Sequence, residues 1–176
     1  MSVVIETNDP ETSKIRSISA FAAQTARALQ VCDLLEALAD DLPRRQAPVW
    51  RETQHQCKSV LGPHFSFLVS DVLPTLLKRS SESADREDVL VRLMNDNQDQ
   101  LDALEDLDDL MSEALISERF DQNAESLGYA LRGYFETLRH NLRWEVDVLW
   151  PLSKRILSVE DVRKLRAELS SSTALH

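Results

Sequence analysis

The sequence predicts an all-α protein, arranged as an antiparallel up-down-up-down four-helix bundle with a short C-terminal helix. The chain has 176 residues and only three Gly, so its backbone has few of the residues that turns and tight loops require. Apolar residues recur at three- and four-residue spacing through four long segments, which is the period of an amphipathic helix. The connections between these segments are short, and short connections make neighbouring helices antiparallel.

The first element is expected to be a long helix that follows a flexible arm. Residues 1–12 are polar and contain a proline, which predicts the arm. From about Ser13, apolar residues such as Phe21 and Leu35 keep helical spacing until Pro43. The first helix is therefore predicted to end at that proline.

The second helix is predicted from about Trp50 to Arg79. It has apolar residues at helical spacing along its whole length. Gly62, Pro63 and Pro74 lie inside it. Because proline cannot donate the backbone hydrogen bond of a helix interior, we expect kinks or a broken turn at these positions.

Three further helices complete the pattern, at about residues 86–115, 121–156 and 158–169. The stretch "SVED" at the start of the last one has the spacing of a capping box, in which Ser158 and a side chain three residues later satisfy each other's backbone N–H groups. Residues 13–170 are thus expected to form one domain, with 171–176 as a C-terminal tail.

Composition limits the classes of partner. The formal net charge is −10 and the isoelectric point is near 4.8, so nucleic acid and anionic membrane surfaces would repel the protein. The opening residues lack a basic start followed by an apolar run, and no uninterrupted apolar stretch approaches the length of a membrane span. These features predict a cytoplasmic protein with no nucleic-acid or membrane partner.

Each long helix has a polar interruption in its apolar stripe. A buried polar group without a partner costs about 1–3 kcal/mol, and an unpaired carboxylate costs more, so we expect these side chains to meet at one level and to bond to one another. For Thr25 the alternative is a bond to its own helix backbone or a position facing solvent. The interrupting residues are Thr25, His64, Asn97, Asn141 and Glu145.

Two segments of the chain match in register. "HFSFLVSDVLP" begins at His64 and "NLRWEVDVLWP" begins at Asn141, and each ends on a proline. In this match His64 corresponds to Asn141 and Leu68 corresponds to Glu145. The two halves of the predicted bundle therefore look related.

On these segments, together with "VCDLLEALADDLP" and "LSVEDVRKL", the chain resembles the hemerythrin-like, or HHE cation-binding, family over roughly residues 15–169. The resemblance implies a four-helix bundle. It also implies that each half would supply a His-x-x-x-Glu pair and one further His, which together hold two irons in the bundle.

The chain departs from that pattern at four of the six ligand positions. Leu68 stands at a Glu position and Asn141 at a His position, and by a weaker alignment Thr25 and Asn97 stand at the two remaining His positions. Only His64 and Glu145 are competent ligands. No diiron cofactor and no metal site are therefore expected, with a single weakly held ion at His64 and Glu145 as the alternative.

Without iron, Glu145 needs other partners inside the bundle. The expected partner is His64, through an imidazolium–carboxylate bond, with Asn97 and Asn141 donating or accepting around it. Cys32 and Cys57 are expected to face each other two turns from this layer. They are interpreted as buried, inert thiols, with a redox switch as the alternative.

The resulting function hypothesis is a non-catalytic regulatory or protein-binding module, since no phosphate loop or nucleophile motif is present. The candidate surfaces are the acidic residues of the third helix, which could instead be a simple solvated face, and Trp144. For Trp50 and Trp150 core packing is favoured. The alternatives are a metal-binding protein of atypical site in oxygen or redox sensing, and a binder of a small molecule in the vacated space. A homo-oligomer is possible.

Overall fold

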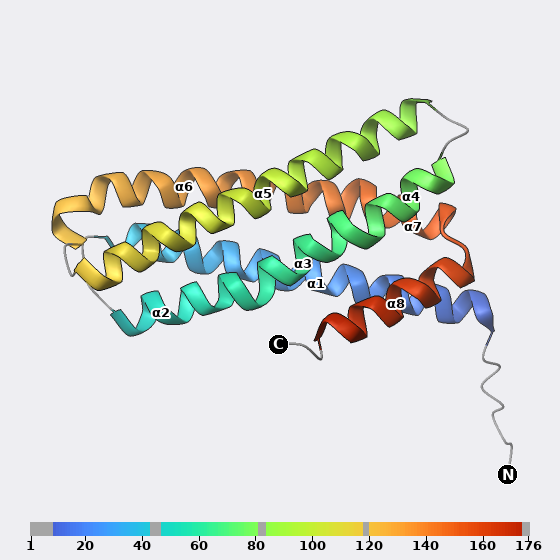
Figure 1. The fold of residues 1–176 in the computed structure, drawn as a ribbon, viewed down its shortest axis with the longest axis horizontal. Coiled ribbons are helices and arrows are strands. Elements are labelled where there is room, and N and C mark those ends of the chain that lie inside the picture. The colour runs from blue at the N-terminus through green and yellow to red at the C-terminus, as the bar shows by residue number, and fades with distance from the viewer. Residues whose placement is uncertain (1–8, 43–46, 81–83, 118–119, 174–176) are drawn as a thin grey trace, which may run out of the picture.

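The computed structural model describes residues 9–42, 47–80, 84–117 and 120–173, and these residues are almost entirely helical, with no strand among them (Figure 1). The prediction of an all-α protein is confirmed. Most of the arm expected over residues 1–12 and the end of the tail expected over 171–176 lie outside the described residues.

Helix α1 (Pro10–Asp40) begins three residues before the expected start. Asp9 caps it, because its side chain accepts a hydrogen bond from the backbone N–H of Thr12 at 3.3 Å. Pro10 occupies the first turn, where a missing N–H costs nothing. The polar composition that suggested a flexible arm is therefore, in residues 9–12, the composition of a helix start.

The second helical segment runs unbroken from Ala47 to Ser80, so the broken turn expected at its prolines is wrong. Two stretches of π-helix interrupt it instead. Its parts are α2 (Ala47–Gln56), η1 (Cys57–Leu61), α3 (Gly62–Phe67), η2 (Leu68–Val72) and α4 (Leu73–Ser80).

The prolines explain the π-helical stretches. In each stretch, the residue directly before a proline donates its backbone N–H to the carbonyl five residues earlier, and the proline follows in the next turn. A proline has no N–H for the carbonyl four residues earlier, and its ring would clash with that carbonyl. Widening the turn by one residue removes the clash without ending the helix. The donors are Gly62 and Leu73 in this segment. Trp150 is the donor after a third π-helical stretch, η3 (Glu145–Leu149), which lies later in the chain.

The remaining helices reverse direction in turn. They are α5 (Ala84–Ser117), α6 (Phe120–Trp144), η3 (Glu145–Leu149), α7 (Trp150–Ile156) and α8 (Val159–Thr173). Figure 1 shows that α1, α2–α4, α5 and α6–α7 lie along the same long axis, each running opposite to the one before. Contacts close a ring, since α1 packs on α2 and α6, while α5 packs on α4 and α6.

The core of the described residues lies inside this ring, where each helix contributes its apolar stripe. Fully buried side chains from successive helices include Leu35, Trp50, Leu68, Leu90 and Leu131. The segment 47–80 is long and apolar enough to cross a membrane by length and composition alone. Here many of its apolar side chains, among them Leu61, Phe65 and Leu76, are buried in the core, and a core helix can have the same composition.

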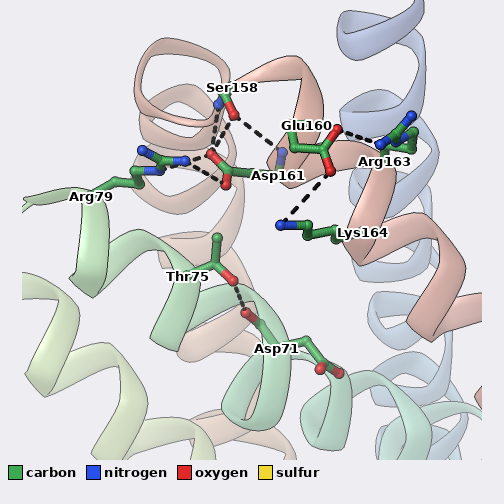
Figure 2. Close-up of polar contacts among 8 residues, drawn as sticks. All are labelled: Asp71, Thr75, Arg79, Ser158, Glu160, Asp161, Arg163 and Lys164. Carbon is green, nitrogen blue, oxygen red and sulfur yellow. Dashed lines mark hydrogen bonds and ion pairs between the residues drawn. The ribbon is translucent and has the colours of Figure 1, made fainter.

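Helix α8 folds back against α1 and the second segment, and a polar clamp fixes its start (Figure 2). Ser158 Oγ accepts from the backbone N–H of Asp161, and the backbone N–H of Ser158 donates to Asp161 Oδ2 at 2.9 Å. The predicted capping box is confirmed. Arg79 donates to both oxygens of the Asp161 carboxylate, at 2.9 and 3.0 Å, which ties α4 to α8.

Candidate functional site

The five polar interruptions of the apolar stripes are all buried in the middle of the helical ring. Thr25 on α1, Asn97 on α5 and Glu145 on η3 are fully inaccessible to solvent, and His64 on α3 is 2% exposed. Asn141 on α6 is 4% exposed. Thr25 thus does not face a groove or solvent. We call these five buried residues the interior polar layer, and hydrogen bonds join them in two groups, Glu145 with His64 and Thr25, and Asn97 with Asn141.

Glu145 is the centre of this layer. His64 Nε2 lies 2.9 Å from Glu145 Oε2 and 3.1 Å from Oε1. Thr25 Oγ1 donates to the same Oε2 at 2.7 Å. A carboxylate has only acceptors, so the imidazole donates from Nε2. The bonds from His64 and Thr25 supply donors to a carboxyl group that is fully inaccessible to solvent, and an unpaired carboxylate at this point would be costly.

Trp150 extends the network and was missed at the level of the sequence. Its Nε1 donates to Thr25 Oγ1 at 2.9 Å, so the threonine hydroxyl accepts from the indole and donates to Glu145. In a regular helix, side chains five residues apart point about 140° away from each other. The π-helical turn of residues 145–149 reduces this difference, because Trp150 N bonds to Glu145 O, five residues earlier. The signal in the sequence was Pro151, which directly follows that turn and marks a change in the helix backbone.

The two asparagines bond to each other and not to the central pair, which corrects the expectation for them. Asn97 Nδ2 donates to the carbonyl of Leu93 at 2.7 Å, and Asn141 Nδ2 lies 3.4 Å from Asn97 Oδ1. Among the described residues, Asn141 Oδ1 and His64 Nδ1 have no hydrogen-bond partner. Both oxygens of Glu145 therefore have partners, whereas one polar atom of His64 and one of Asn141 do not.

Leu68 and His140 complete the comparison with the predicted ligand positions. Leu68 is fully buried at the first residue of η2, and Glu145 is the first residue of η3, so the two matched segments adopt the same local geometry. His140 is exposed, and its Nε2 accepts from Trp144 Nε1 at 3.2 Å. It does not reach the interior layer.

The donor set of this layer does not fit the two irons that the family resemblance implies. A bridged pair of irons needs several imidazoles and carboxylates directed at it. Here Leu68 offers no donor atom, the three positions at Thr25, Asn97 and Asn141 offer neutral oxygen or amide groups, and the remaining His and Glu bond to each other. Among the residues that the structure describes, no group of three or more His, Cys, Asp and Glu could hold a metal ion.

A second, weakly polar group of buried side chains lies apart from the interior polar layer. Cys32 and Cys57 are buried with free thiols, and burial raises the pKa of each to about 12. Tyr134 is buried beside them, and its hydroxyl has no partner among the described residues. Because the thiolate is the reactive form of cysteine, these thiols are protonated and unreactive at neutral pH.

The surface of α5 is strongly acidic. Its exposed carboxylates include Asp99, Glu105 and Asp106, and no Lys or Arg occurs over residues 93–117. One acidic residue is used within the fold, since Asp108 pairs with Lys58 at 2.8 Å and accepts from Gln54 at 2.7 Å. The others form a solvated face.

Comparison of the chain with protein-family models, with curated proteins and with solved structures found no match.

Proposed function

We propose that this chain is a hemerythrin-like helical-bundle protein in which a hydrogen-bonded network takes the place of the two irons, and that it acts as a non-catalytic module that binds another protein. The proposed arrangement is an up-down-up-down four-helix bundle formed by α1, α2–α4, α5 and α6–α7, with α8 as the short C-terminal helix. The reversing directions of these segments and the two matched π-helical turns support it.

The observation that carries the proposal is the state of Glu145. Of the two competent ligands left in the chain, one is bonded to the other, and Thr25 occupies the same carboxylate oxygen. A metal ion at this point would have to break the His64–Glu145 bond and would gain only two protein ligands. Oxygen carriage, peroxide chemistry and iron sensing all need such an ion, so none of them belongs to the proposed function.

Metal analysis tests this part of the proposal. We expect protein purified without chelators to contain iron, zinc and manganese far below one ion per chain. Its melting temperature should be the same with EDTA and with added Fe(II) under anaerobic conditions, because an ion that binds only the folded state would raise it. Stoichiometric metal, or a melting temperature that falls with EDTA, would favour the alternative of an atypical metal site in oxygen or redox sensing.

The surface supports a protein partner better than other partners. The acidic face of α5 repels nucleic acid and anionic membranes and attracts a basic protein surface. Trp144 is 39% exposed, whereas Trp50 and Trp150 are buried, so only Trp144 of the three remains available for binding. We further propose a cytoplasmic location, without a membrane partner.

Affinity capture with paired variants tests the binding role. Wild-type protein and a variant with Asp99→Asn and Asp106→Asn are used as baits in extract of the source cells. A control bait carries Asp71→Asn and Glu168→Gln, which remove the same number of charges between η2 and α8. We expect a protein that the wild type and the control retain and the α5 variant loses. Identical captures by all three baits would refute a binding role for the α5 face.

A further inference from the structure

The surface between α5 and α6 carries a groove that the proposed function does not explain. It has a volume of about 380 Å³ and is more apolar than polar. Ala103, Leu107 and Leu110 line it from α5, and Ala130 and Gly133 line it from α6. The small side chains open the groove between two helices that otherwise pack closely, so that side chains of a partner can enter it.

The groove contains a polar atom that lacks a partner. Gln100 lines the groove and is 4% exposed, and its Oε1 has no hydrogen-bond partner among the described residues. A buried carbonyl without a donor costs about 1–3 kcal/mol. A ligand that brings an N–H or O–H group to this point therefore gains a hydrogen bond to Gln100 Oε1. The cost of removing water from this oxygen has already been met by folding.

The charge around the groove selects the ligand further. Asp99 and Asp106 lie at its edge, no Lys or Arg lines it, and neither carboxylate forms an ion pair among the described residues. A ligand for this place thus combines apolar side chains with cationic groups on the side that meets α5. A second copy of this chain fits poorly, because each copy carries a formal net charge of −10.

We propose that the groove between α5 and α6 binds a basic amphipathic helix of the partner protein. The lining residues on α5 span 99–110, which is about 17 Å or three helical turns at about 1.5 Å per residue. Apolar residues at positions i, i+3 or i+4 and i+7 of the partner helix enter the groove. Its Lys and Arg residues flank Asp99 and Asp106, and a polar donor reaches Gln100 Oε1. This inference rests on the proposed function, since it names the site and class of the partner.

Gly133 allows the groove to be filled without disturbing the fold. A Cβ atom added at Gly133 would meet no other atom within 4 Å. Gly133→Phe therefore projects its ring into the groove, and replacing glycine inside a helix favours the helical backbone. The control variant Glu136→Phe places the same ring on an exposed position one turn or less away on α6. Equal melting temperatures of the two variants would show that both are folded.

The test is a titration of fluorescein-labelled peptide followed by fluorescence anisotropy. The probe is an 18-residue synthetic peptide with Leu at positions i, i+3, i+4 and i+7 of each repeat and Lys elsewhere. A scrambled peptide of the same composition, without one apolar face, is the control peptide. We expect Gly133→Phe to weaken binding of the probe at least tenfold, and the Asp99→Asn, Asp106→Asn variant to weaken it about three- to tenfold.

Several results would overturn the inference. They are equal affinity of Gly133→Phe and wild type, equal affinity of the two peptides, or a change in oligomeric state of Gly133→Phe on light scattering, which would make a second copy the occupant. Failure of the proposed function is a separate result, since it requires that none of the three baits captures a partner protein. If a partner is captured and its cross-links lie on another face, the binding role stands and the groove is refuted.

Discussion

Replacing Glu145 tests whether the interior is held together by hydrogen bonds to this carboxylate. Oε2 accepts from both Thr25 and His64, and Oε1 has only the longer contact to His64. A glutamine whose carbonyl oxygen takes the place of Oε2 keeps both of these bonds. It loses the charge and places an NH₂ group at the weaker contact. We expect Glu145→Gln to lower the free energy of unfolding by about 1–2 kcal/mol.

Glu145→Ala should lower the free energy of unfolding by more than Glu145→Gln does. It leaves the Thr25 hydroxyl and the His64 Nε2–H buried without acceptors, and it leaves a cavity where the side chain was. Breaking a buried pair by removing one member costs about 3–5 kcal/mol, which includes the unpaired donors. The difference between the two variants is therefore about 2–3 kcal/mol. For a domain of this size, 1 kcal/mol corresponds to about 2–4 °C in melting temperature.

The assay is urea unfolding followed by circular dichroism at 222 nm, with calorimetry to give melting temperatures. Glu136→Gln and Glu136→Ala are the matched control pair, because Glu136 is exposed on the neighbouring helix α6. Both controls should change stability by less than about 0.5 kcal/mol. Equal stability of Glu145→Gln and Glu145→Ala would refute the reasoning, because it would mean that the hydrogen bonds to Oε2 contribute nothing.

Three further predictions concern the indole of Trp150, the carboxylate of Asp161 and the two buried thiols. Trp150→Phe keeps the packed ring but removes the donor to Thr25, so urea unfolding should show a loss of about 0.5–1.5 kcal/mol, and an unchanged midpoint would exclude the indole bond. Burial acts to raise the pKa of Asp161, but hydrogen bonds from Arg79 and Ser158 outweigh it and lower this pKa from 3.8 to about 2. The stabilisation is thus complete above pH 3.8 and is lost as the pH falls through 2, so thermal melts of Asp161→Asn should lie below wild type at pH 7 and converge with it near pH 2. Cys32 and Cys57 should resist iodoacetamide at pH 8 until the protein is unfolded, and mass spectrometry showing alkylation of the native protein would contradict their burial.

The helices and their buried faces could be predicted from the sequence because both depend on local periodicity. The spacing of Phe21 and Leu35, for example, places them on one face of α1, and the structure buries both. The prolines at 63, 74 and 151 also marked where the backbone changes. The prolines alone could not distinguish a broken turn from a π-helical turn, because that choice depends on whether neighbouring helices hold the chain straight on both sides of the proline.

The partners of Glu145 were only partly within reach of the sequence. Its pairing with His64 followed from the need of a buried carboxylate for a donor, and the structure contains this bond. The position of Trp150 did not follow, because it depends on the π-helical turn between Glu145 and Trp150. The groove between α5 and α6 was not predicted either, since it exists only where Ala103 on α5 and Gly133 on α6 come to line one surface.

The amino-acid sequence by itself therefore determined which side chains enter the interior, because the helical period and the chemistry of each residue are properties of the chain alone. Which of these side chains touch was decided by the tertiary structure. The rotation and axial level of each helix come from packing of the whole interior. Shifting one helix along its axis by a single residue would change every side-chain pair that it forms with its neighbours. For this reason the polar interruptions of the apolar stripes were readable in the sequence, whereas the bonds between these side chains were visible only once the helices had been assembled.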